Sequence, residues 1–204
     1  MLGLLSQSKK QIEAWPMIRR WREFRKRLRH KRFLRLYDLP KEGVVLDISC
    51  GDGDFLAVLR SYFPELDLHG IDISPEYIES ARAKHSWATL ATGNAEEVPY
   101  ADDTFHVVLS CMSLHHYRKP HLVFSEAARV LRPGGRLYVV DFMPHNSIVQ
   151  FLFNLDGCPE PYHFERYYRM SEVESLAQDA GLMLRDKRRM DWFSNAKILL
   201  LQKA

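Results

Sequence analysis

The chain has 204 residues, of which 46% are hydrophobic and 27% charged, a composition that suits one domain with a buried core. The sequence contains no run of about 18 apolar residues, so a membrane-spanning helix is excluded on length. The net charge of +3 hides an asymmetry, because residues 1–42 hold 13 of the 29 basic residues and only 4 of the 26 acidic ones, whereas residues 43–204 are mildly acidic.

The first 42 residues are predicted to form a basic helical appendage. Apolar residues recur there at three- and four-residue spacing, as on one face of a helix: Ile18, Trp21, Phe24 and Leu28. Arginines and lysines cover the remaining faces. Such a helix can pack its apolar stripe on the domain that follows, or use residues 16–36 to contact an anionic membrane surface or nucleic acid phosphates.

From residue 43 the chain alternates short apolar runs with helical segments, which predicts one domain over residues 43–204. Strands are expected at 44–48, 66–71, 87–91, 105–111 and 136–142. Helices are expected from about Asp54 to Tyr62, after the capping Ser74 with Pro75, and from Pro120 to Leu131. This alternation implies right-handed crossovers and a parallel sheet that is covered by helices on both faces.

The last part of the chain departs from the alternation. Ser171 is expected to cap a helix through Ala180. Residues 182–190 and 197–201 would then form two antiparallel strands, joined by a turn at Ser194-Asn195, at one edge of the sheet. Residues 143–170 show no clear period and are interpreted as an insertion on the substrate side of the domain.

The turn after the first strand, residues 47–53, is the first candidate for a ligand site. Ligands of an open parallel sheet bind at the carboxyl ends of the strands, where the strand order reverses. Gly51 and Gly53 permit positive φ and let a ligand approach the backbone, and the helix that follows offers a positively polarised N-terminus. Asp72 ends the second strand 19 positions after Gly53, a separation at which an acidic residue can accept hydrogen bonds from ribose hydroxyls.

A nicotinamide dinucleotide is one alternative ligand for these residues. Its fingerprint needs a third small residue for close helix–strand packing, and Leu56 at that position is too large. The fingerprint also gives no role to Asp47. In a site for S-adenosylmethionine (SAM), an acidic residue at this point can orient the loop and meet the ammonium group of the methionine moiety, so the residues favour SAM.

Residues 44–53, VVLDISCGDG, resemble the first motif of the class I SAM-dependent methyltransferases, in particular the small-molecule enzymes of the methyltransferase type 11-like subgroup. Four further stretches match that family in order: residues 70–74, 93–100, 105–110 and 126–135. The resemblance implies a Rossmann-like sheet of seven mostly parallel strands in the order 3-2-1-4-5-7-6, with the last strand antiparallel and helices on both faces. It also implies SAM as the cofactor and S-adenosylhomocysteine (SAH) as the product.

The resemblance implies roles for the residues that match the family's motifs. The residues expected around the cofactor are Asp47, Ser49, Gly51, Gly53, Asp72, Ile73, Asn94, Ala95 and Ser110. Asp72 would hold the ribose, Ile73 would pack on the adenine, and Asn94 with the Ala95 backbone would bind the adenine edge. Three positions depart from the usual pattern: Ser49 replaces a glycine, Asn94 an aspartate that binds adenine, and His106 a structural aspartate.

Two histidines that follow the fourth strand are the candidates for catalysis. His116 and His115 stand near the point where the reactive methyl group is expected, and either could remove a proton from the acceptor, with His116 slightly preferred. Alternatively, both only shape the pocket, since this family often works by proximity and orientation. Cys50 is expected to be inert.

The three cysteines, odd in number and without C-x-x-C spacing, argue against a disulfide framework and a zinc site. They favour reduced thiols in a cytoplasmic protein, with a peripheral membrane position open through the basic helix. The sequence as a whole predicts methyl transfer from SAM to a small-molecule or lipid-like acceptor by direct in-line displacement. The alternatives are an RNA methyltransferase that docks through its basic N-terminal helix, and a non-catalytic SAM-binding or adaptor protein.

Overall fold

A computed structural model of the chain describes residues 32, 34–36, 39–155, 166–190 and 196–204. The chain divides into two units, Met1–Leu39 and Pro40–Ala204, and the second contains every strand of the described ranges. Of the predicted basic appendage, residues 32 and 34–36 are helical, residues 39–42 are described and are not helical, and the rest lies outside the described residues. The predicted turn Ser194-Asn195 also lies outside them.

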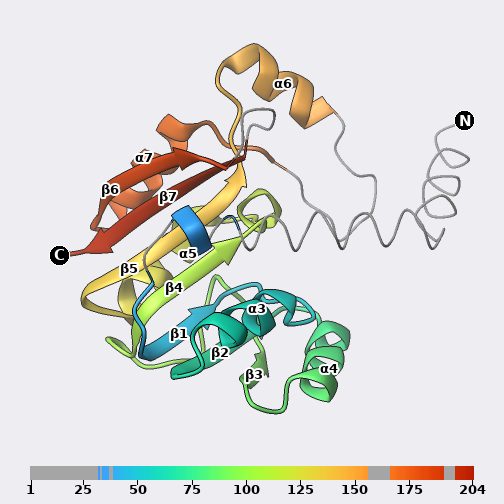
Figure 1. The fold of residues 1–204 in the computed structure, drawn as a ribbon. Coiled ribbons are helices and arrows are strands. Elements are labelled where there is room, and N and C mark those ends of the chain that lie inside the picture. Colours follow the sequence, from blue (N-terminus) through green and yellow to red (C-terminus); the bar gives the residue numbers. More distant parts are fainter. Residues whose placement is uncertain (1–31, 33, 37–38, 156–165, 191–195) are drawn as a thin grey trace, which may run out of the picture. The chain divides into compact units, whose positions relative to one another are not determined.

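A seven-stranded sheet in the order β3-β2-β1-β4-β5-β7-β6 forms the centre of the second unit (Figure 1). Its strands are β1 (Gly43–Asp47), β2 (Leu66–Asp72), β3 (Thr89–Thr92), β4 (Phe105–Cys111), β5 (Leu131–Phe142), β6 (Leu182–Arg189) and β7 (Ala196–Lys203). The first five strands pair in parallel, and β7 is antiparallel to both β5 and β6. The predicted fold class and strand order are confirmed, and the order reverses between β1 and β4.

Helices cover both faces of this sheet. They are α3 (Asp54–Tyr62), α4 (Pro75–Lys84), α5 (Pro120–Val130), α6 (Ser147–Leu155) and α7 (Met170–Asp179), with a short 3-10 helix, η1 (Leu114–His116). The first two pack against β2 and β3, whereas α5 and α7 pack against each other and against β5 and β6. Figure 1 shows α3 in front of the sheet and α5 and α7 behind it. Among the helices of the described ranges, none is long and apolar enough to cross a bilayer.

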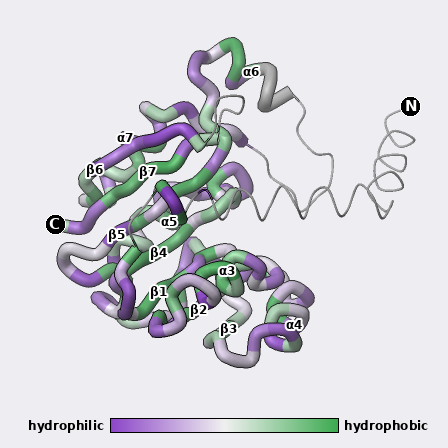
Figure 2. Tube along the Cα trace, in the orientation of Figure 1, coloured by the Kyte–Doolittle hydropathy of each residue, from purple (hydrophilic) through white to green (hydrophobic). Residues whose placement is uncertain are grey.

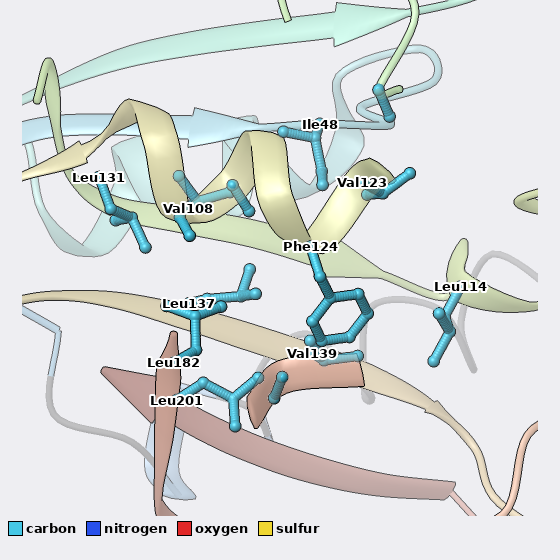
Figure 3. Close-up of a cluster of buried hydrophobic side chains, with 14 of the residues drawn as sticks. Ile48, Val108, Leu114, Val123, Phe124, Leu131, Leu137, Val139, Leu182 and Leu201 are labelled. Carbon is cyan, nitrogen blue, oxygen red and sulfur yellow. The ribbon is translucent and has the colours of Figure 1, made fainter. Parts of the chain in front are cut away.

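The main hydrophobic core lies between the sheet and the pair α5 and α7 (Figure 3). Phe124 of α5 points toward the strands and is fully buried there. The same cluster contains apolar side chains from the strands and from the residue that follows β1: Ile48, Val108, Leu137, Val139, Leu182 and Leu201. Because the central strands are buried on both faces, they are apolar almost throughout, while the edge strand β6 is hydrophilic (Figure 2).

The two predicted helix caps have opposite outcomes. Ser74 caps α4 as predicted, because its hydroxyl accepts a hydrogen bond from the backbone N–H of Tyr77. Ser171 does not cap α7, which begins at Met170 with Arg169 in the cap position. The carboxylate of Glu172 accepts the N–H of Arg169 at 2.8 Å, and this contact places the cap two residues before the predicted one.

Several other predicted boundaries were wrong by a few residues. The third strand runs from Thr89 to Thr92 instead of 87–91, and the C-terminal hairpin pairs Ala196–Lys203 instead of 197–201. The strand β5 begins at Leu131 and not at residue 136. The Arg-Pro-Gly-Gly sequence, predicted as a turn before the strand, lies within β5 at a shift of its register against β4. The segment 143–170, in which the sequence shows no clear period, contains α6.

Candidate cofactor site

The turn between β1 and α3 is tied to the end of β2 by the carboxylate of Asp72. Its Oδ2 accepts the backbone N–H of Gly51 at 2.9 Å, and its Oδ1 accepts that of Ser74 at 3.0 Å. A carboxylate has about four acceptor positions, so Asp72 can hold the turn and still accept from two hydroxyl groups of a ligand. Asp47 ends β1 beside this turn and is almost fully buried, with its Oδ1 3.3 Å from the N–H of Ser49.

The two glycines of the turn serve different purposes. Both have positive φ, +54° at Gly51 and +80° at Gly53, which an L side chain adopts only with strain. A Cβ added at Gly51 would meet no atom within 4 Å, whereas one at Gly53 would lie 2.6 Å from Cδ2 of His85. Gly51 therefore borders open space, as a ligand-facing backbone should, and Gly53 allows α3 and α4 to approach each other.

The expected adenine side of the site lies at the ends of β2 and β3. Ile73 exposes 73% of its surface, which is unusual for an isoleucine and leaves an apolar face for a ring to cover. The Oδ1 of Asn94 accepts the N–H of Glu96 at 2.9 Å, so one of its two lone pairs is already used within the loop. The Ala95 side chain is buried below that loop.

Arg129 of α5 fixes the segment after Ala95. Its guanidinium donates to the carbonyl oxygens of Val98 and Tyr100, at 2.9 and 2.8 Å, and to the carboxylate of Glu126. The same Glu126 carboxylate accepts the N–H of Val98 at 2.7 Å. The hydrogen bonds from Arg129 hold the pKa of Glu126 below its usual value. The predicted adenine loop is therefore clamped to α5 by a charged network.

A cluster of four hydroxyl groups joins the ends of β1 and β4. The Tyr117 hydroxyl, fully enclosed just after η1, lies 2.9 Å from Ser49 Oγ, 3.2 Å from Ser110 Oγ and 3.0 Å from Ser113 Oγ. Burial raises the pKa of Tyr117 to about 12. This cluster gives Ser49, which stands where the family commonly has glycine, a partner 68 positions away in sequence. Sequence reasoning missed Tyr117 and Ser113, because nothing local to them indicates this contact.

The two candidate catalytic histidines differ sharply in environment. His115 is buried, and its Nδ1 lies 2.8 and 2.9 Å from the carboxylate oxygens of Asp141 at the end of β5. Its ring stacks on Tyr167 at a centroid distance of 5.0 Å. His116 is exposed, with its ring centroid 4.0 Å from that of His115. The site's arrangement thus favours His115, whereas the sequence slightly favoured His116.

Cys50 and His106 have contacts consistent with structural roles. Cys50 is buried, and this burial raises the pKa of its thiol well above the usual value, so the reactive thiolate is suppressed. His106 accepts the N–H of Val44 through Nδ1 at 3.0 Å, close to the start of β1 and therefore away from the carboxyl ends of the strands. Within the described ranges, no cluster of three or more His, Cys, Asp or Glu side chains is arranged to hold a metal ion.

The structure thus brings the predicted cofactor residues to one edge of the sheet, at or just after the carboxyl ends of β1 to β4. They are Asp47, Ser49, Gly51, Gly53, Asp72, Ile73, Asn94, Ala95 and Ser110. SAM requires carboxylates for its ammonium group and its ribose, a glycine that borders open space, and an exposed apolar face for its adenine ring. The residues present therefore fit SAM.

Comparisons with known proteins agree with this geometry. Residues 46–139 match the family model described as a methyltransferase domain. The malonyl-[acyl-carrier protein] O-methyltransferase of Hahella chejuensis is 33% identical over 156 residues, which cover 72% of this chain and 54% of that protein. A demethylmenaquinone methyltransferase of Chlorobaculum parvum is 34% identical over 114 residues, 55% of this chain and 47% of that protein. The chain spans about half the length of the curated relatives it matches.

Solved structures show the same fold at low sequence identity. A SAM-dependent methyltransferase from Methanosarcina mazei superimposes with a TM-score of 0.68 at 22% identity, covering 81% of this chain and 94% of that one. A [4+2]-cyclase superimposes with a TM-score of 0.71 at 17% identity, covering 87% and 80%. The fold alone therefore does not specify a reaction. Family model, relatives and fold together show that the chain belongs to the class I SAM-dependent methyltransferase family, whose cofactor is SAM.

Proposed function

We propose that the chain transfers the methyl group of SAM to a small-molecule or lipid-like acceptor by direct in-line displacement. The observation that carries this proposal is the Asp72 carboxylate, which holds the Gly51 turn at 2.9 Å beside the open space at that glycine. SAM, when bound, supplies a methyl group on a positively charged sulfur. The chain's own residues have to bind that cofactor, orient the acceptor and exclude water.

Each part of the cofactor would have a partner among the described residues. Asp72 would accept hydrogen bonds from the ribose hydroxyls, and Asp47 would face the ammonium group of the methionine moiety. The N-terminus of α3 follows the turn directly and places the positive end of its dipole near the methionine carboxylate. Ile73 would lose its exposure to water when the adenine ring covers it, a favourable apolar contact.

The proposed acceptor class is supported by the segment 143–170. Its helix α6 exposes Ile148 and Phe151, three residues apart and therefore on one side of the helix. Exposed apolar side chains of this size suit contact with an apolar molecule. The two curated relatives described above are named for malonyl-[acyl-carrier protein] and demethylmenaquinone. A phthiotriol dimycocerosates methyltransferase of Mycobacterium ulcerans is 33% identical over 56% of this chain and 43% of that protein.

A two-part measurement tests the proposal. Isothermal calorimetry should detect binding of SAH to the full chain, and SAM labelled in its methyl group should transfer label to a total lipid or small-metabolite extract. Binding without any transfer would favour a non-catalytic SAM-binding protein. Absence of SAH binding would remove the proposal altogether.

A further inference from the structure

The contact between His115 and Asp141 fixes which nitrogen of the imidazole carries a proton. The Asp141 carboxylate is 1% exposed and accepts the N–H groups of its own neighbour Phe142 at 2.6 Å and of the His115 backbone at 3.1 Å. It also lies 2.8 Å from Nδ1 of His115. Because an ionised carboxylate can only accept, Nδ1 is the protonated nitrogen of the neutral ring, and Nε2 carries the lone pair.

The surroundings hold the His115 ring in one orientation. Tyr167 stacks on it with an interplanar angle of 13°, and His116 lies against it at an angle of 48°. The carbonyl oxygen of His115 accepts the N–H of Arg166 at 2.8 Å, which joins η1 to the segment before α7. A ring fixed by a hydrogen bond to a carboxylate and by a stack is oriented in advance for one task.

The position of His115 in the fold places that ring at the candidate site. It belongs to η1, the short helix that follows β4 at the carboxyl edge of the sheet. Tyr117, two residues later, contacts Ser49 after β1 and Ser110 in β4, both of which are among the residues expected around the cofactor. The segment that carries His115 is therefore joined through Tyr117 to two of the residues expected at the cofactor.

A buried base of this kind is useful for only some acceptors. A carboxylic acid, with an ordinary pKa of about 4, is already ionised at neutral pH and needs no base. A phenol, with a pKa of about 10, or an alcohol keeps its proton and is a poor nucleophile until that proton is removed. We infer that Asp141 positions His115 as the general base of the reaction, and that the acceptor is therefore a compound that keeps its proton at neutral pH, such as a phenol or alcohol, and not a carboxylate. This inference rests on the proposed function.

The step is balanced in atoms and charge. The acceptor oxygen forms a bond to the methyl carbon while the bond between sulfur and that carbon breaks, and the bonding electron pair stays on sulfur. The proton of the acceptor hydroxyl moves to Nε2 of His115. The imidazolium that results is stabilised by the Asp141 carboxylate at 2.8 Å and then releases its proton to solvent. His115 is the catalytic residue in this step, and Asp141 is a positioning residue.

The chemical stability of the methylated product tests the acceptor class without naming the acceptor. The full chain is incubated with methyl-labelled SAM and a total lipid extract, and the product is treated with mild alkali. Methyl ethers resist this treatment, whereas methyl esters release labelled methanol. We expect the label to survive. Release of most of the label as methanol would identify a carboxylate acceptor and overturn the inference.

Variants test the roles of the two residues. With 4-dodecylphenol as acceptor at pH 7.5, His115→Gln should lower the transfer rate by about 10²-fold or more, and Asp141→Asn should lower it by at least about tenfold. His121→Gln, at an exposed histidine of α5, is the matched control and should change the rate less than about threefold. Above pH 10, where the phenol ionises by itself, the deficits of both variants should shrink. A purely structural defect would persist at every pH, and persistence would refute the assigned roles.

Two independent readouts separate this inference from the proposed function. If the wild-type chain does not bind SAH in calorimetry, the proposed function fails. If it binds SAH and transfers label, but both variants keep the wild-type rate, only the inference fails. Nitrogen-15 NMR of the histidine rings gives a check that needs no acceptor: Nδ1 of His115 should be protonated in the wild type with SAH bound, and a proton on Nε2 alone would contradict the assignment.

Discussion

Gly51 and Gly53 stand two residues apart in one turn, yet an alanine at each should cause a different defect. A residue with a side chain in the left-handed region costs roughly 1–2 kcal/mol. At Gly51 this is the whole cost, because the added Cβ would meet no atom within 4 Å. At Gly53 the Cβ would lie 2.6 Å from His85 Cδ2, and such overpacking adds roughly 1–3 kcal/mol.

We expect Gly51→Ala to lose mainly SAH affinity and Gly53→Ala to lose mainly stability. For a domain of this size, about 1 kcal/mol lowers the melting temperature by about 2–4 °C. Gly51→Ala should therefore melt only slightly below the wild type, but its Cβ fills the space assigned to the cofactor, so SAH affinity should fall about tenfold or more. Gly53→Ala should lose more stability and, at temperatures where it is folded, less affinity.

Thermal melts followed by circular dichroism and calorimetric titration with SAH measure both quantities on the same two variants. Wild-type SAH affinity in Gly51→Ala would refute the assignment of the open face at this glycine to the cofactor. Equal losses of stability in the two variants would refute the distinction drawn from the His85 contact.

Three further outcomes are expected from the described contacts. The pKa of Tyr117 is raised to about 12 in the folded chain, so the phenol ionises at lower pH in the unfolded chain. The free energy of unfolding should therefore fall by roughly 3 kcal/mol as the pH rises from 10 toward 12. Denaturant titrations of Tyr117→Phe should not show this fall. Arg129→Ala should lower the free energy of unfolding by roughly 2 kcal/mol, because it leaves the Val98 and Tyr100 carbonyls without their charged donor. An unchanged free energy of unfolding would contradict the role of Arg129 in fixing this loop to α5. Cys50 should resist iodoacetamide at pH 8 in the folded chain and react in denaturant, as mass spectrometry of the modified peptide would show.

The parts of the fold that follow a simple periodic signal could be predicted from the sequence. The bounds of α3 and β4 agree with the prediction at both ends, because amphipathic spacing marks the helix and a continuous apolar run marks the buried strand. The start of α7 could not be predicted from its serine, since a longer side chain, that of Glu172, reaches back to the residue before the helix. The helix α6 was missed because six of its nine residues are apolar, and a short apolar run does not distinguish a helix from a strand.

The candidate site was predictable wherever a residue ends a strand. Asp72 was identified because acids at the carboxyl ends of parallel strands meet ligands, and the same rule applied to β5 would have identified Asp141. Tyr117 and Ser113 could not be found in this way, because their importance depends on contacts with a strand end far away in the sequence. The environments of His115 and His116 likewise depend on Asp141, 26 positions after the first of them.

Binding of SAM at the edge of the sheet around Asp72 underlies both the proposed function and the assignment of His115. Calorimetric titration of SAH into wild type, Asp72→Ala and Asp67→Ala tests it most directly, since Asp67 is an exposed acid near the opposite end of the same strand. We predict that Asp67→Ala binds SAH as the wild type does, and that Asp72→Ala binds it at least about 30-fold more weakly, because it loses charge-assisted hydrogen bonds to the ribose together with the support of the Gly51 turn. Equal affinity in all three proteins would contradict this placement of the cofactor.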